Sequence, residues 1–355
     1  MEFPLYLGKL GKNSIMIDLI HIGDYKTGTS WFQKQVFPVH PELYYLDSGI
    51  HPEVVHLMHQ LIDIRDLDFN PEVLRGRFAD VLNDIDSQNR KIVISREALS
   101  GSYPAGDHAK RIAERLYAVF GKTKVLIVIR EQFSMLKSIY SQYVKIGGTL
   151  SFEEFVYDPI VSPGVVEKLK YHKIIDAYVN IFGKENVFVG LFEEFKSDNE
   201  LFVKRVLEFS GCSDAWQLRS KDVLVNPSLR KAGLEIQRFI NHFLRNDFNP
   251  CKPIIPLDKV VALFLSSEKK KKLLTGTRNR LIYSMPGCDD AFVLRYAINF
   301  ALTLQVSKLC ERIQLGSKLT IPNSIVESLR DEFVESNKLL HDKYNLHVDK
   351  YGWSL

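Results

Sequence analysis

Short apolar runs alternate with amphipathic stretches along the first two thirds of the chain. Each apolar run is short and bounded by polar residues or glycine, as in strands buried on both faces of a parallel sheet. We expect such strands at residues 14–23, 91–95, 124–130 and 186–195. Hydrophobic residues recur with helical spacing between the runs. This pattern predicts one helix that starts near residue 30 and three more at residues 108–121, 134–148 and 200–211. Each of the last three ends at glycine.

Strands that alternate with helices in this way predict an α/β fold, with a mostly parallel sheet flanked by helices. From about residue 226 onward the pattern is mainly helical, and no internal repeat or long linker divides the chain. We therefore expect a single domain over residues 1–355 with a helical C-terminal extension. In such folds ligands bind at the carboxyl ends of the strands.

Composition narrows the class of ligand only slightly. The chain of 355 residues is 45% hydrophobic and 25% charged, with a formal net charge of +4. A mildly basic protein suits anionic ligands, but the charge is far below that of most nucleic-acid-binding domains, so no nucleic-acid partner is expected. The N-terminus lacks the long apolar segment of a signal peptide, and no run is long enough to span a membrane. These features predict a cytoplasmic protein, of bacterial origin.

The stretch "HIGDYKTGTSWFQ", residues 21–33, has the composition of a phosphate-binding loop. Gly23 and Gly28 have the spacing of the two glycines in a P-loop, G-x-x-x-x-G-K-[ST]. Thr29 stands where the P-loop lysine belongs, and the lysine of this loop, Lys26, comes two residues before Gly28. The backbone amides of residues 27–31 can still hold a phosphate at a helix N-terminus. The displaced lysine counts against the alternative of an ATP-dependent P-loop kinase.

Residues 22–33 resemble the 5′-phosphosulfate loop of sulfotransferases that use 3′-phosphoadenosine 5′-phosphosulfate (PAPS), although Tyr25 replaces the usual proline. The stretch "KVLIVIREQFSMLKSIYSQY" is similar to the 3′-phosphate motif of the same family, in which Arg, Ser and Tyr match Arg130, Ser138 and Tyr140. The turn "REQ" departs from the common R-[ND]-P. The segment "VNPSLRKAG" is a partial match to a further 3′-phosphate loop, at Asn226, Ser228, Arg230 and Lys231. The resemblance extends over nearly the whole chain.

The resemblance implies transfer of a sulfuryl group from PAPS to an acceptor hydroxyl, with release of the product PAP and no requirement for a metal. Lys26 would then stabilise the bridging oxygen as the S–O bond breaks. The 5′-phosphate would be held by Thr27, Gly28, Thr29 and Ser30, and adenine would stack on Trp31. Arg130, Ser138 and Tyr140 would hold the 3′-phosphate, since a guanidinium and a hydroxyl can grip one anion.

The acceptor hydroxyl needs a general base. Glu97 follows the strand at residues 91–95, at the place where cytosolic members of the family have a histidine. His51 and His108 are rival bases. A carboxylate base is known among the carbohydrate sulfotransferases of the family. The resemblance therefore implies a carbohydrate or glycolipid acceptor, which we expect to be bound by loops in 45–75, 100–110 and 145–170. A small natural product stays open as the acceptor. A non-catalytic PAP-binding module stays open as an alternative function of the protein. The sequence does not indicate the oligomeric state.

Overall fold

The computed structural model describes residues 17–24, 26–46, 51–83, 90–101, 108–162, 164–213, 230–243, 266–272, 290–312 and 316–355. The chain divides into two compact units. The first comprises Met1–Glu131, Glu167–Leu224 and Val334–Leu355, and the second comprises Gln132–Val166 and Val225–Phe333. Compact units of this kind also occur inside single domains, so the expectation of one domain over the whole chain stays a prediction.

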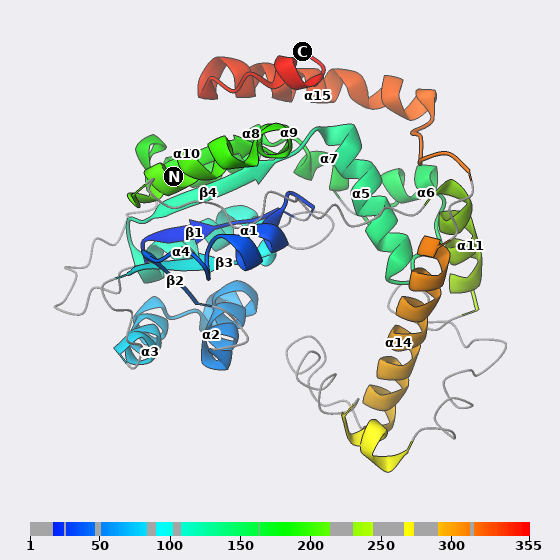
Figure 1. Cartoon of the computed structure of the whole chain (residues 1–355), viewed down its shortest axis with the longest axis horizontal. Coiled ribbons are helices and arrows are strands. Elements are labelled where there is room, and N and C mark those ends of the chain that lie inside the picture. Colours follow the sequence, from blue (N-terminus) through cyan, green and yellow to red (C-terminus); the bar gives the residue numbers. More distant parts are fainter. Residues whose placement is uncertain are drawn as a thin grey trace. The chain divides into compact units, whose positions relative to one another are not determined.

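A five-stranded sheet forms the centre of the first unit (Figure 1). Its strands are β1 (Leu19–His21), β2 (Leu43–Tyr45), β3 (Lys91–Ser95), β4 (Lys124–Ile129) and β5 (Val187–Leu191). They pair in the order β2-β3-β1-β4-β5, and all four pairings are parallel. All strands therefore have their carboxyl ends at one edge of the sheet, and the predicted α/β class with a parallel sheet is confirmed.

Helices cover both faces of this sheet. The helices of the first unit are α1 (Thr29–Gln35), α2 (Pro52–Asp63), α3 (Pro71–Asn83), α4 (Ala109–Phe120), α8 (His172–Phe182), α9 (Phe192–Ser197) and α10 (Asn199–Ser210), together with short 3₁₀ turns at Asp66–Asp68, Glu97–Ser100, Lys184–Asn186 and Val348–Tyr351. On one face, α1, α9 and α10 bury an aromatic core that includes Phe32, Phe195 and Phe202 against the sheet residues Leu126 and Val128. On the other face, α4 packs against α8, and α8 packs against β4 and β5.

The predicted strands at residues 91–95 and 124–130 are confirmed by β3 and β4, while β2 was not predicted. The strand expected at residues 186–195 is wrong beyond Leu191, because α9 begins at Phe192. Glu193 and Glu194 lie in the first turn of α9, where carboxylates favour a helix by interacting with its dipole. For the strand expected at 14–23, only residues 17–23 are described, and β1 is confined to Leu19–His21.

The second unit is helical in its described residues. It contains α5 (Gln132–Lys145), α6 (Phe152–Tyr157), α11 (Lys231–Asn241) and α14 (Asp290–Arg312), whereas α7 (Val165–Lys168) and α15 (Asn323–Tyr344) each contribute to both units. The amide of Asn241 on α11 donates to the carbonyls of Val144 and Gly148 at 2.8 Å each, and so anchors α11 to the end of α5. The predicted helical C-terminal part is confirmed over the described residues.

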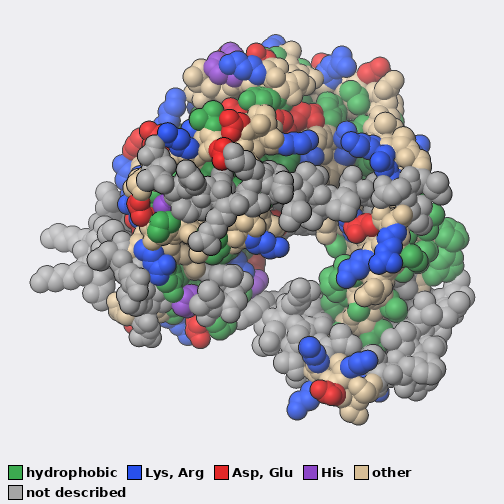
Figure 2. All heavy atoms as spheres, viewed as in Figure 1, with side chains coloured by type: hydrophobic (Ala, Val, Ile, Leu, Met, Phe, Trp, Pro, Cys, Tyr) green, Lys and Arg blue, Asp and Glu red, His purple; other side chains and the backbone are tan. Residues whose placement is uncertain are grey.

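Charged side chains of both signs are mixed over the visible surface of the first unit (Figure 2). This mixture accords with the small net charge of +4. In the part of the chain that the structure describes, none of the helices combines the length and the apolar character needed to cross a membrane.

Candidate active site

The candidate phosphate-binding loop connects β1 to α1 and is closed by its own hydrogen bonds. The hydroxyls of Thr27 and Thr29 both donate to the carbonyl of Asp24, at 2.7 and 3.2 Å. Both threonines are buried. The loop residues on either side of Lys26 are therefore held in place by the chain itself.

Two glycines permit this closure. A Cβ on Gly23 would lie 2.2 Å from the Thr29 hydroxyl oxygen, so no larger residue fits where the loop approaches itself. Gly28 caps α1 with a φ of 88°, in the left-handed region that glycine adopts at little cost. A Cβ at Gly28 would also meet the Phe195 ring at 3.0 Å. The glycine spacing read from the sequence thus has a steric cause at both positions.

Lys26 is half-buried at the turn of the loop. Its φ of 65° is left-handed, which is uncommon for a residue with a side chain, and strained conformations of this kind cluster at functional sites. Its carbonyl accepts a hydrogen bond from Nη1 of Arg130 at 3.2 Å. The end of β4 therefore supports the backbone of the loop that carries the lysine.

Glu97 lies directly after β3, in the 3₁₀ turn Glu97–Ser100. The pKa of this carboxyl group is raised, mainly by burial. The charge of Lys26 lowers it, Asp24 also raises it, and Lys168 lowers it. Glu97 and Lys26 are thus close enough to interact, as expected for residues at the carboxyl ends of adjacent parallel strands. A carboxylate with a raised pKa is a stronger base than an ordinary glutamate.

A buried ion pair between Asp24 and Lys168 completes this group of charges. Nζ of Lys168 lies 2.9 Å from Oδ1 of Asp24, and the two side chains are 5% and 8% exposed. The hydroxyl of Ser100 donates to the carbonyl of Glu97 at 2.9 Å and to Asp24 Oδ1 at 3.4 Å. Lys168 was missed in the sequence, although an aspartate inside an anion-binding loop signals that some cation must neutralise it.

Arg130 follows β4 and is half-buried. Besides its bond to Lys26, its guanidinium lies over the ring of Phe192, 5.0 Å from the centroid. The pKa of the Arg130 guanidinium is lowered by burial, and the nearby Glu193 opposes this effect. Glu193 in turn accepts the backbone N–H of Glu131 at 3.1 Å. The strand end thus holds this arginine at the same edge of the sheet as Lys26.

Trp31 and Ser30 differ in their surroundings. Trp31 is 7% exposed and belongs to the aromatic core, with ring contacts to Phe32 and Phe195 at centroid distances of 5.5 and 5.0 Å. Its role in stacking on adenine stays a prediction. Ser30 is exposed and lines a cavity of about 360 Å³ that is also lined by Gln33, Arg96 and Glu97. This polar cavity gives the candidate base access to a ligand.

The two rival bases have other surroundings. His51 precedes α2, and its Nε2 shares a hydrogen bond of 2.9 Å with the hydroxyl of Tyr44. His108 is exposed and precedes α4 in a left-handed conformation, with a φ of 69°. The charge of Lys26 acts on the carboxyl group of Glu97, whereas the hydrogen bond of His51 is to Tyr44 of β2.

The other predicted 3′-phosphate ligands belong to the second unit. Ser138 is half-buried on α5. Tyr140 is 1% exposed, and its hydroxyl donates to the carbonyl of Leu150 at 3.0 Å. Arg230 precedes α11, and the exposed Lys231 donates its N–H to the carbonyl of Ser317 at 3.0 Å. Asn226 and Ser228 lie outside the described residues.

Three possible metal ligands meet elsewhere in the first unit. One ligand atom from each of His341, His347 and Asp349 lies within 4.8 Å of the others. None of the three was among the predicted site residues.

No protein family model matches the chain, and no curated protein matches it. Solved structures that are similar to it include three sulfotransferases or sulfotransferase domains. The sulfotransferase from Alicyclobacillus acidocaldarius is 20% identical, with a TM-score of 0.44 over 60% of this chain and 86% of that one. The sulfotransferase domain of the Synechococcus PCC 7002 olefin synthase is 13% identical, with a TM-score of 0.37 over 69% and 91% of the two chains. The sulfotransferase domain from the curacin biosynthetic pathway is 11% identical, with a TM-score of 0.35 over 60% and 81%. These likenesses are too distant to assign a role to any residue of this chain.

Proposed function

We propose that this protein transfers a sulfuryl group from PAPS to an acceptor hydroxyl. The observation that carries the proposal is the meeting of Lys26, Glu97 and Arg130 around one closed loop at the carboxyl edge of a parallel sheet. Each of the three follows or lies just beyond a different strand, β1, β3 or β4. In-line group transfer of this kind depends on positioning and on charge stabilisation, which such an arrangement can supply.

In the proposed reaction Lys26 faces the oxygen that bridges phosphorus and sulfur. Charge accumulates on that oxygen as its bond to sulfur breaks, and an ammonium group nearby stabilises it. The amides that follow Lys26 bind the 5′-phosphate, which leaves as part of PAP. Arg130 is the ligand proposed for the 3′-phosphate, and the roles of Ser138 and Tyr140 stay predictions from the sequence.

Glu97 is the proposed general base. Its raised pKa suits the removal of a proton from an alcohol as the oxygen attacks sulfur. His51 and His108 stay alternatives for this role. No metal is assigned to the reaction, and the cytoplasmic location and bacterial origin stay predictions.

A thermal-shift titration tests the donor. A ligand that binds only the folded state raises the melting temperature with its concentration, by an amount set by its Kd. We expect PAP to raise the melting temperature, and ATP with Mg²⁺ to raise it much less. A shift with ATP and Mg²⁺ but none with PAP would contradict the proposal and favour the kinase.

A non-catalytic PAP-binding protein is the alternative that this titration leaves. The raised pKa of Glu97 argues against it, because a half-buried carboxylate costs stability that a protein that only binds PAP would not need. Production of PAP from PAPS in the presence of an acceptor separates the two.

A further inference from the structure

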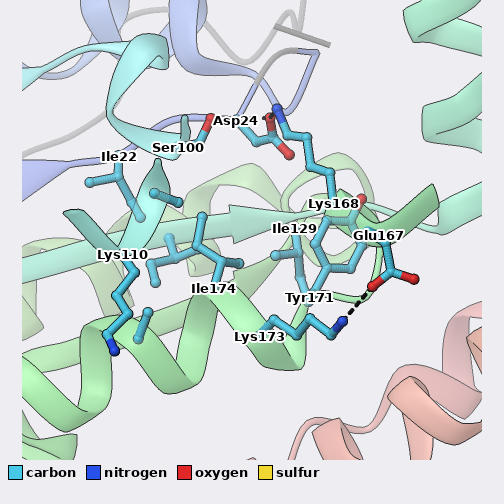
Figure 3. Close-up of a pocket in the computed structure, with 13 residues that line it drawn as sticks. Ile22, Asp24, Ser100, Lys110, Ile129, Glu167, Lys168, Tyr171, Lys173 and Ile174 are labelled. Atoms are coloured by element: carbon cyan, nitrogen blue, oxygen red, sulfur yellow. Dashed lines mark hydrogen bonds and ion pairs between the residues drawn. The ribbon is translucent and has the colours of Figure 1, made fainter. Parts of the chain in front are cut away.

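A second cavity lies on the face of the sheet opposite to α1, between the sheet, α4 and α8 (Figure 3). It has a volume of about 250 Å³. Most of its lining is apolar and comes from Ile22 and the β4 residues Ile127 and Ile129, from Ala109 on α4, and from Ile174 and Ala177 on α8. A lining whose surface is mostly apolar favours aliphatic groups over sugars, whose hydroxyls would lose hydrogen bonds to water there.

Three polar residues of this cavity belong to the candidate active site. Asp24, Lys168 and Ser100 line it, and Ser100 is bonded to the carbonyl of Glu97. Asp24 and Lys168 are also the charges, besides Lys26, that act on the Glu97 carboxyl. The apolar space therefore reaches the edge of the sheet where the proposed base and the donor loop lie.

Tyr171 adds a hydroxyl to this lining. It is 1% exposed, and its hydroxyl has no hydrogen-bond partner among the described residues. Burial and the charge of Asp24 both raise its pKa, so it stays protonated and can donate. A buried donor without a partner is rare in folded proteins, and a bound hydroxyl oxygen would satisfy it.

The remaining lining residues connect the cavity to solvent. Lys110, Glu167 and Lys173 are exposed, and Glu167 forms ion pairs with Lys170 and Lys173. A ligand can thus be apolar along its length, polar at the end near Asp24 and Ser100, and in contact with solvent elsewhere.

We propose that this cavity binds the aliphatic part of the acceptor, so that the substrate class is an alcohol on a hydrocarbon chain and not a free sugar. The inference rests on the proposed function. In the reaction, the alcohol oxygen forms a bond to sulfur and its proton passes to the carboxylate of Glu97. The bond between sulfur and the bridging oxygen breaks, and its electron pair stays on the phosphate of PAP.

The volume of the cavity limits the length of the hydrocarbon chain that it can hold. If each methylene group takes about the volume of one water molecule, ~30 Å³, the cavity holds about eight of them. Each buried methylene contributes about 0.8 kcal/mol, which corresponds to an approximately fourfold lower KM. We expect KM to fall along the series 1-butanol, 1-hexanol and 1-octanol, and to fall no further for 1-dodecanol.

The test measures PAP formed from PAPS with these alcohols and with N-acetylglucosamine, for the wild type and for Ile174→Trp. The new indole fills the cavity and should raise KM for 1-octanol more than tenfold. Ile181→Trp is the matched control, because Ile181 is half-buried on the same helix and does not line the cavity. Ala177→Leu is a milder variant that fills the same space.

The outcomes separate this inference from the proposed function. Wild-type protein that PAP does not stabilise would overturn the proposed function itself. Stabilisation by PAP together with transfer to N-acetylglucosamine and none to 1-octanol would overturn the aliphatic acceptor alone. An unchanged KM for 1-octanol in both Ile174→Trp and Ala177→Leu would also overturn it, provided that PAP stabilises both variants.

Discussion

The charged edge of the sheet and the aromatic core on the α1 face begin three residues apart on the same chain segment, at Asp24 and His21. The two regions treat ionisable side chains in opposite ways. In the core, His21 is fully buried, and burial lowers its pKa to about 3, so the ring is neutral. At the edge, Asp24 keeps its charge buried by pairing with Lys168.

The hydrogen-bonding groups of the two regions also differ in charge: those in the core are neutral, and those at the edge are charged. Nδ1 of His21 shares a hydrogen bond of 2.8 Å with the hydroxyl of Ser95, which also accepts from the Gln33 amide at 3.2 Å. These neutral groups tie β1, β3 and α1 together. At the edge the bonds and charges converge on Lys26 and Glu97. A neutral network stabilises the frame, while a charged one at the strand ends is available for chemistry.

The largest effect is expected from Lys26→Ala. Removal of a cation that faces the leaving oxygen should lower kcat about 10³- to 10⁵-fold, the range found for arginine fingers in phosphoryl transfer. The Kd for PAP should change far less. Steady-state kinetics and calorimetric titration with PAP measure the two quantities.

Lys34→Ala is the matched control, because Lys34 is an exposed lysine on α1. If Lys26→Ala weakened PAP binding as much as it lowered kcat, Lys26 would be a ligand of the phosphate and not a group that acts on the transition state.

The next effect is expected from Glu97→Gln. Loss of the base should lower kcat about 10²- to 10⁴-fold. Because the pKa of Glu97 is raised in the folded protein, its effect on stability is favourable at low pH and is lost as pH rises through that pKa. At pH 7 the glutamine variant should therefore melt at the same temperature as the wild type or higher. Kinetics and thermal melts at pH 7 check both.

Glu53→Gln, at an exposed glutamate on α2, controls for the substitution itself. The pH profile of wild-type kcat should fall on the acid side of the raised pKa. An unchanged rate in Glu97→Gln, with loss in His51→Ala or His108→Ala, would transfer the role of base to that histidine.

The buried ion pair predicts an effect on stability. Lys168→Met leaves the charge of Asp24 buried without its cation and should lower the free energy of unfolding by about 3–5 kcal/mol. Adding Asp24→Asn to this variant should restore most of the loss. Urea unfolding of the two single variants and the double variant gives the coupling. Additive losses would show that the pair does not act as a unit.

The smallest effect concerns His21. Its depressed pKa means that the unfolded chain binds the extra proton, so the stability it contributes is complete above pH 6.5 and is lost as pH falls toward 3. Between pH 7 and pH 5 the loss should be about 2 kcal/mol. His21→Gln should flatten this part of the pH dependence, which urea unfolding at several pH values measures. A dependence that stays as steep in the variant would assign it to other groups.

The sequence was sufficient to predict the site residues that follow the ends of strands. Lys26, Glu97 and Arg130 all follow apolar runs, and parallel strands bring their carboxyl ends to one edge. The roles assigned to these residues stay predictions. Lys168 was not found, because 144 residues separate it from Asp24 and no local pattern links the two.

Two further features needed the structure. The apolar residues around Phe192 suggested a longer strand, and the acidic pair in the first turn of α9 was the contrary signal. The isoleucines of the apolar cavity come from the residue after β1, from β4 and from α8, and have the spacing of ordinary core residues. Hydrophobic periodicity marks a buried face but does not show whether neighbouring side chains fill the space beside it.

A crystal structure with PAP tests the central claim most directly. The account predicts the 5′-phosphate on the backbone amides that follow Lys26, with the ammonium group of Lys26 and the carboxylate of Glu97 beside the oxygen that carried sulfur. It also predicts the 3′-phosphate in contact with Arg130. PAP bound away from the loop between β1 and α1, or bound there with Lys26 directed away from it, would contradict the account.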